Sequence, residues 1–91
     1  MPIIKIPSPL QSYIGDQKSL TISGSNVEEV IINLVKRYPV IKPHIFDPEG
    51  RLRSFITIFL GEVNIKDTRN GMKTLVKDDD QLVIVTSMAG G

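Results

Sequence analysis

The residues with the clearest potential for chemistry are the last two of the chain, Gly90 and Gly91. Glycine has no Cβ, so this backbone can bend and thread a narrow channel where other residues would clash. Four extended residues span roughly 13–14 Å, which is far enough to bring a terminal carboxylate into the active site of another protein. The alternative is an ordinary frayed end, because chain termini are usually poorly ordered. The rest of the chain must decide between these two interpretations.

Other residue types offer little for catalysis. The chain contains no cysteine, which excludes disulfides, thiolate zinc sites and a cysteine nucleophile. His44 is the only histidine, and its place beside Pro43 favours a surface or locally satisfied side chain over a catalytic one. The acidic run 78–80 is interpreted as a solvated turn, since a metal site needs further oxygens at defined spacing. We therefore expect no metal site, no bound cofactor and no enzyme active site.

Size and composition describe one small globular domain. The chain has 91 residues, of which 41% are hydrophobic and 23% are charged, and these values exclude the disordered class. The formal net charge of +1 gives no reason to expect a nucleic acid or a membrane surface as partner. No apolar run approaches the length of a membrane span, and the N-terminus lacks a secretory pattern. We expect a cytoplasmic protein.

Short apolar, β-branched runs predict a sheet of four or five strands. The runs are 3–6, 18–22, 55–60 and 82–85, with 63–65 as a short edge strand. The first two runs are expected to pair as a hairpin with a long, loose connection. Pro7 and Pro9 end the first run, because each removes a hydrogen-bond donor from the strand ladder. Segment 40–54, punctuated by prolines and a glycine, is predicted to be a loop. Segment 72–76 fits either a single helical turn or a short extended piece.

One amphipathic helix is predicted between the second and third strands. Its apolar side chains recur at three- and four-residue steps, at Val27, Val30, Ile31, Leu34 and Tyr38. The spacing of a capping box occurs twice, at Ser25/Glu28 and at Asn26/Glu29. Pro39 ends the helix, because the residue before a proline avoids helical geometry. The predicted fold class is α+β, a β-grasp (ubiquitin-like) domain over residues 1–86 with the helix on one face of a mixed sheet, followed by a flexible tail over residues 87–91.

The second face of the predicted sheet is also apolar. If one set of alternating strand residues packs on the helix, another set points the other way: Phe55, Phe59, Val83 and Val85. One long helix cannot easily cover both faces, and an uncovered apolar patch is a mark of a protein interface. The alternative is that segment 40–54 folds across this face. An open patch would lie beside the strand that launches the tail, so it is a natural docking surface for the protein that receives the tail.

Five stretches together match a known pattern. They are 15–20 (GDQKSL), 30–34 (VIINL), 47–52 (DPEGRL), 55–59 (FITIF) and 88–91 (MAGG). With these stretches the chain resembles, over nearly its whole length, the ubiquitin-like sulfur-carrier family of the ThiS/MoaD type. The long segment 39–54 is most similar to the carrier of a cysteine-biosynthesis route, while segment 61–77 departs from the family pattern.

The resemblance implies a carrier whose reacting group is the carboxylate of Gly91, preceded by Gly90. An E1-like enzyme uses ATP to adenylate this carboxylate, and sulfur then displaces AMP to leave a thiocarboxylate. The thiocarboxylate is delivered into the active site of an acceptor enzyme, where it donates sulfur. The chain is then a protein co-substrate and not an enzyme, and ATP is bound by its partner. The tail residues Met88 and Ala89 are expected to join the docking patch in contacting partners.

Three roles are compatible with this pattern. Cysteine biosynthesis is favoured, with a cysteine synthase-like acceptor and a metalloprotease that releases cysteine as partners. The second is the small subunit of molybdopterin synthase, held by its large subunit. The third is a ubiquitin-like modifier or plain binding module, in which Gly91 forms an isopeptide bond to a lysine or does nothing.

Overall fold

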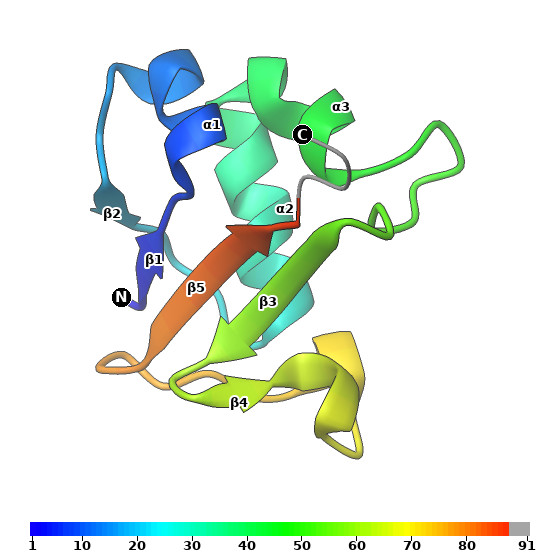
Figure 1. Ribbon diagram of the computed structural model, residues 1–91. Coiled ribbons are helices and arrows are strands. Elements are labelled where there is room, and N and C mark those ends of the chain that lie inside the picture. The colour runs from blue at the N-terminus through cyan, green and yellow to red at the C-terminus, as the bar shows by residue number, and fades with distance from the viewer. Residues whose placement is uncertain (88–91) are drawn as a thin grey trace.

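A computed structural model describes residues 1–87, so the predictions for Met88, Ala89, Gly90 and Gly91 lie outside the described residues. Five strands form one mixed sheet in the order β2-β1-β5-β3-β4 (Figure 1). Their bounds are β1 Ile3–Lys5, β2 Ser19–Thr21, β3 Ile56–Leu60, β4 Val63–Asn64 and β5 Gln81–Thr86. β1 runs parallel to β5, and the other neighbouring pairs are antiparallel. The predicted β-grasp arrangement is confirmed, including the N-terminal hairpin and the short edge strand.

The main helix is α2, Val27–Arg37, which crosses behind β5 and β3 in Figure 1. The structure uses the second of the two predicted capping pairs. The Asn26 side chain accepts a hydrogen bond from the Glu29 backbone N–H at 2.8 Å, and the Glu29 carboxylate accepts one from the Ser25 N–H at 3.0 Å. These bonds satisfy donors that a helix start would otherwise leave unpaired. The apolar stripe is buried as predicted, with Tyr38 half-buried at its end.

Two segments predicted as loops are partly helical, and both predictions need correction. The connection after β1 is not loose, because it forms α1, Ser8–Gln11, and the 3₁₀ helix η1, Ser12–Ile14. Segment 40–54 begins inside the 3₁₀ helix η2, Pro39–Ile41, and continues into α3, Lys42–Ile45. Each of these elements places an apolar side chain in the core: Leu10, Ile14, Ile41 and Ile45.

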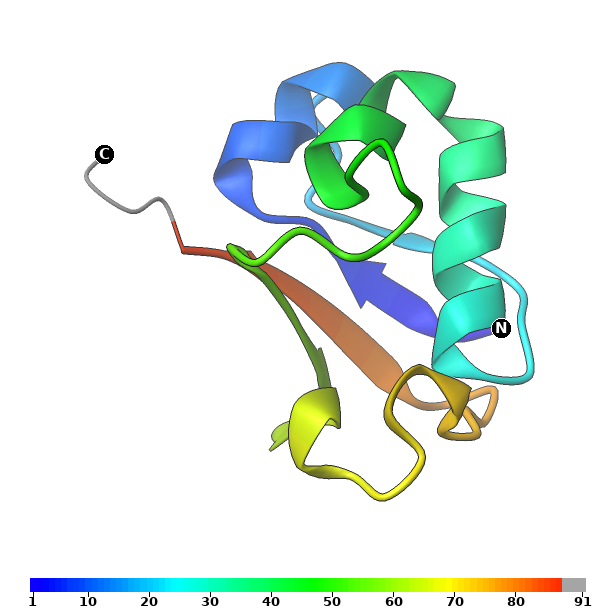
Figure 2. The same ribbon diagram turned by 90° about the vertical axis from the view of Figure 1, so that its right-hand side faces the viewer.

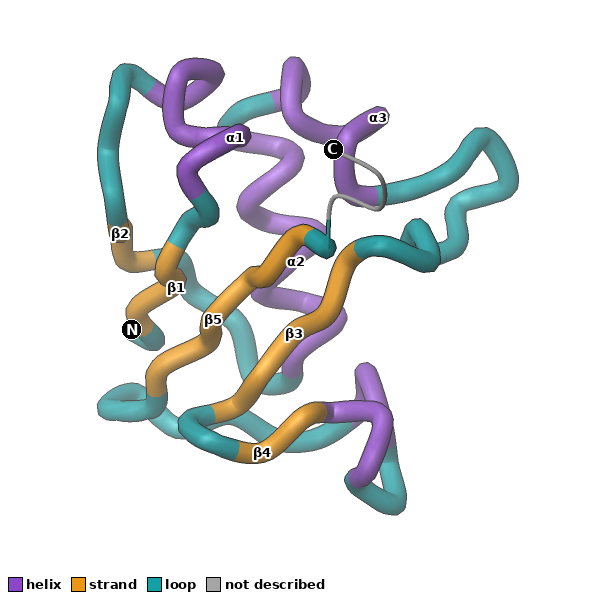
Figure 3. The backbone as a smooth tube through the Cα atoms, in the orientation of Figure 1, coloured by secondary structure: helices purple, strands orange, loops and turns teal. Residues whose placement is uncertain are grey.

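Segment 61–77 wraps the lower edge of the sheet with two 3₁₀ helices, η3 Ile65–Asp67 and η4 Gly71–Lys73 (Figure 3). Beyond η4 the chain is extended and ties back to the start of α2. The Val27 N–H donates to the Thr74 carbonyl and the Val76 N–H donates to the Ser25 carbonyl, both at 3.0 Å. Segment 72–76 therefore combines the two predicted alternatives, a helical turn followed by an extended piece.

The core lies between one face of the sheet and the helices. Alternate strand residues supply its sheet side: Ile4, Leu20, Ile56, Ile58, Leu82 and Ile84, all at most 8% exposed. Burying such a side chain contributes about 1.5–3 kcal/mol. In Figure 2 the sheet is seen nearly edge-on, and α1, α2 and α3 lie on the same side of it. Among residues 1–87, segment 40–54 packs on this helix side and leaves the other face of the sheet open.

Candidate functional site

The open face of the sheet carries the predicted apolar patch, which consists of Phe59, Val83 and Val85. Phe59 lies directly opposite Val83 in the β3–β5 pair, and Val85 lies opposite Thr57. Phe59 and Val83 are half-buried, while Val85 is 39% exposed. Close cross-strand neighbours of this kind form a continuous surface. The strand alternation thus brings three of the four predicted sheet residues together on one face.

Phe55, the fourth predicted patch residue, does not belong to β3, and its part in partner binding stays a prediction. It lies in the turn before β3, is half-buried and packs against the core cluster. The guanidinium carbon of Arg53 lies 6.0 Å from the centre of its ring. The sequence pattern extended β3 by one residue, which placed Phe55 on the open face by alternation.

The last described residue is fixed by Phe55. The Ser87 N–H donates a hydrogen bond to the Phe55 carbonyl at 2.8 Å, one residue beyond the end of β5. Since a strand rises about 3.3 Å per residue, Val83 lies about 13 Å from Ser87 along the strand and Val85 about half of that. The patch therefore lies near Ser87, the first residue of the predicted tail. The predicted boundary between residues 86 and 87 stays a prediction, because the chain beyond Ser87 is not described.

Two neighbours of the patch were missed in the sequence. Lys5 on β1 lies opposite Val83 and brings a cation to the edge of the apolar surface. A groove of about 550 Å³ separates the segment after β1 from β5, and Pro7 and Pro9 line it. The sequence pattern assigned these prolines only the ending of a strand. Neither feature has a sequence signal of its own, because both depend on the parallel pairing of the two ends of the chain.

His44 and the acidic run 78–80, which were also considered for chemistry, make contacts within the fold. The rings of His44 and Tyr13 stack with centroids 4.5 Å apart, so the histidine joins α3 to η1. The Asp80 carboxylate accepts a hydrogen bond from the Lys77 N–H at 2.7 Å, as expected for a turn. Within residues 1–87, His, Asp and Glu side chains form no group of three that could hold a metal ion. The helices of this part of the chain are all too short or too polar to cross a membrane.

Comparison with known proteins gives a consistent result. Residues 4–91 match the model of the ThiS family. The sulfur carrier protein CysO of Mycobacterium tuberculosis (strain H37Rv) is 31% identical over 90 residues, which cover 97% of this chain and 96% of that protein. This agreement extends over both the sheet and the terminal segment.

Solved structures show the same fold. A chain in the crystal structure of the Amycolatopsis orientalis BexX/CysO complex superposes with a TM-score of 0.87 at 30% identity, and the match covers both chains completely. The small archaeal modifier protein 1 from Methanosarcina acetivorans superposes with a TM-score of 0.83 at 30% identity, over 98% of this chain and 94% of that one. The β-grasp fold is therefore established for this chain.

Proposed function

The chain belongs to the ThiS family, and we propose from this premise that it is a sulfur carrier protein serving cysteine biosynthesis. The observation that carries the proposal is the match to CysO proteins along the whole chain, with a sequence ending in Gly90-Gly91. The open patch on the sheet supports it, since a carrier must dock on the enzymes that load and unload it.

The proposed chemistry takes place at Gly91. Its carboxylate attacks the α-phosphorus of ATP on an E1-like enzyme, which forms the acyl adenylate and releases pyrophosphate. Sulfide then attacks the acyl carbon, the carbon–oxygen bond to AMP breaks, and a thiocarboxylate remains. In the acceptor the sulfur attacks an activated serine derivative and displaces its leaving group. A protease, proposed to be a metalloprotease, finally hydrolyses the bond to Gly91 and releases cysteine.

In this scheme the chain positions the sulfur, and its partner enzymes supply the catalytic residues. Docking through Phe59, Val83 and Val85 holds the carrier on the enzyme, which gives the sulfur a high effective concentration at the acceptor. The chain acts as a group carrier of protein size, and ATP belongs to the activating enzyme. Met88 and Ala89 are proposed to contact the partner enzymes together with the two glycines.

Transfer to a purified cysteine synthase-like enzyme tests the pathway. Incubating the thiocarboxylate form with this enzyme and an activated serine should give a cysteinyl adduct on Gly91, visible by mass spectrometry of the C-terminal peptide. Retention of the thiocarboxylate, with sulfur passing instead to a molybdopterin precursor on a molybdopterin synthase large subunit, would overturn the assignment to cysteine biosynthesis.

A second role as a protein modifier has its own support. The match to the M. acetivorans modifier protein is as high in identity as the match to the CysO complex. In that role the Gly91 carboxylate forms an isopeptide bond to a lysine. Lysine peptides bearing a diglycine remnant of this chain in a cell digest would favour the modifier role, and their absence under conditions that produce the cysteinyl adduct would exclude it.

A further inference from the structure

A second apolar groove lies on the helix side of the molecule. It runs between α2 and the segment 46–52 and has a volume of about 500 Å³. Apolar side chains from three parts of the chain form its floor: Ile32, Val35, Phe46, Leu52 and Met72. The volume is within the range of sites that take a ligand or an anchoring side chain. This groove is distinct from the patch on the open sheet face.

Segment 46–52, which forms one wall of the groove, is held by its own hydrogen bonds, and Figures 1 and 3 show the path of its backbone. The Asp47 N–H donates to the Arg51 carbonyl at 2.8 Å, which closes a short antiparallel turn. The Asp47 carboxylate accepts hydrogen bonds from the N–H groups of Glu49 and Arg51, both at 2.9 Å. A preformed wall lowers the entropic cost of binding, because little backbone has to be ordered.

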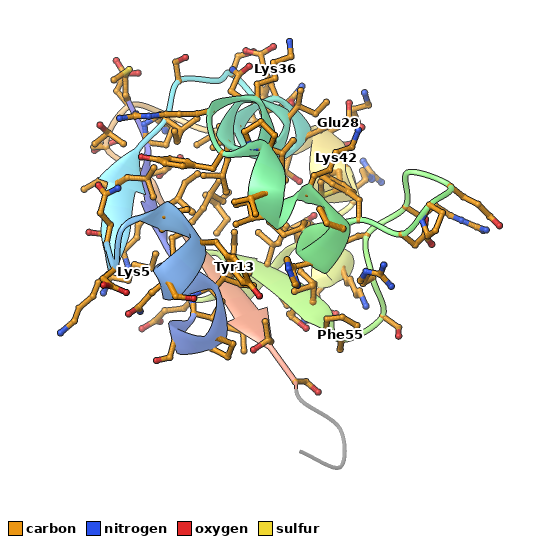
Figure 4. The ribbon with its side chains drawn as sticks, turned by 90° about the horizontal axis from the view of Figure 1, so that it is seen from above. Lys5, Tyr13, Glu28, Lys36, Lys42 and Phe55 are labelled. Carbon is orange, nitrogen blue, oxygen red and sulfur yellow. The ribbon has the colours of Figure 1, made fainter. Side chains whose placement is uncertain are left out.

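The rim of the groove is positive. Lys36 and Lys42 are exposed, and no carboxylate of residues 1–87 pairs with either of them. The remaining charges are neutralised in pairs, since Glu28 binds Lys73 at 2.5 Å and Arg51 contacts Glu49. In Figure 4, Glu28, Lys36 and Lys42 lie together on one side, apart from Phe55 near the end of β5. Two unpaired cations beside an apolar floor are notable in a chain of net charge +1.

We propose that this groove binds a short acidic segment of a partner protein, which inserts a leucine or phenylalanine between Ile32 and Leu52. The inserted side chain covers Ile32, which is 39% exposed. Carboxylates on either side of it contact Lys36 and Lys42. Charge complementarity of this kind selects an acidic segment over a basic one and accelerates its association. The site does not depend on sulfur chemistry at Gly91, so it stands or falls separately from the proposed function.

NMR titration of the ¹⁵N-labelled full chain tests the site. The probe is a synthetic peptide that alternates aspartate with leucine and phenylalanine, and the control peptide carries lysine in place of aspartate. We expect the acidic peptide to shift amide signals of 32–36 and 46–52, and the basic peptide to leave them unchanged. Equal binding of both peptides, shifts confined to the open sheet face, or binding of dodecanoate but of neither peptide would overturn the proposal.

Matched variants separate the contribution of the two lysines from that of the apolar floor. The double change Lys36→Glu with Lys42→Glu should weaken binding by about tenfold or more, whereas Lys18→Glu, in the turn before β2, should not. Ile32→Ser should weaken binding several-fold, and Val63→Ser, which is also exposed but lies on β4, serves as its control. Unchanged affinity in either test variant would contradict the groove. Loading of sulfur on Gly91, measured on the same samples, reports the proposed function independently.

Discussion

At the scale of single residues, the hydrogen bond from the Ser87 N–H to the Phe55 carbonyl divides the residues that the fold requires from those that the proposed chemistry requires. Before Ser87, core packing and strand pairing determine which residue types the fold accepts at the buried positions. Beyond it, the proposed chemistry needs only a carboxylate and residues small enough to enter a channel, which Gly90 and Gly91 satisfy. Phe55 lies at this bond in the turn before β3, because the strand begins one residue later than the sequence pattern predicted.

Asp47 gives the clearest prediction for one side chain. The backbone N–H of Arg51 is the main cause that holds the pKa of Asp47 below its ordinary value of 3.8, and the N–H of Glu49 adds to it. A lowered folded-state pKa means that Asp47 stabilises the fold above pH 3.8 and loses this contribution as the pH falls through the lowered value. We expect Asp47→Ala to be less stable than the parent at neutral pH, with a difference that shrinks in acid.

Urea denaturation of the two proteins across this pH range measures the difference. Asp79→Ala, which removes another exposed turn carboxylate, is the control for the loss of a surface charge and is measured over the same pH range. A stability gap between parent and Asp47→Ala that stays constant or widens below pH 3.8 would contradict the assigned hydrogen bonds.

At the scale of elements, the start of α2 is the point most open to test. Asn26→Ala removes the side-chain acceptor for the Glu29 N–H and should cost about 1 kcal/mol in the free energy of unfolding. Ser25→Ala is the matched control, because it keeps the backbone N–H that donates to Glu29 at 3.0 Å and removes only a long side-chain bond of 3.4 Å. An equal cost of the two changes in thermal or urea unfolding would contradict the assignment of Asn26 as the dominant cap.

The elements that could be predicted are those with a clear periodicity. The stripe of α2 and the alternation in β3 and β5 indicated both the sheet and its open face, because burial on one side leaves a regular pattern. The short helices α1 and α3 could not be found in this way, since four residues are too few to show a period. Pro9 and Pro43 favoured loops, yet each lies in the first turn of its helix, where the missing N–H costs nothing.

The candidate patch was predictable from the sequence only where its residues lie on strands with a clear alternation. Phe59, Val83 and Val85 followed from strand alternation alone. Lys5 and the groove beside Pro7 depend on the parallel pairing of β1 with β5, which joins the two ends of the chain and leaves no local pattern. The groove beside α2 likewise needs three separate segments to meet.

At the scale of the whole molecule, the two faces of the sheet have different surroundings. The helices bury one face of the sheet, and the open face next to β5 carries the patch proposed for docking (Figures 1 and 2). Phe59→Asp places a charge in the centre of this patch and should weaken binding to the E1-like enzyme by about tenfold or more, because central apolar residues dominate interface energies. Thr21→Asp, at an exposed residue of β2 in the same sheet, is the control.

Binding assays and thermal unfolding of both variants decide the outcome. The patch assignment requires that Phe59→Asp lowers partner affinity much more than Thr21→Asp while the protein remains folded. Full affinity in Phe59→Asp would show that docking occurs elsewhere, and unfolding would show that Phe59 belongs to the core.

The intact mass of the protein shows most directly whether Gly91 carries sulfur. The full chain is incubated with an E1-like enzyme, ATP and sulfide, beside a variant that lacks Gly91 and a sample without ATP. We expect the full chain to gain the mass difference between sulfur and oxygen, with the new atom located at Gly91 by fragmentation, and both controls to stay unchanged. An unchanged mass in the full chain under conditions that load a known CysO protein, or an equal gain in the variant without Gly91, would contradict the account.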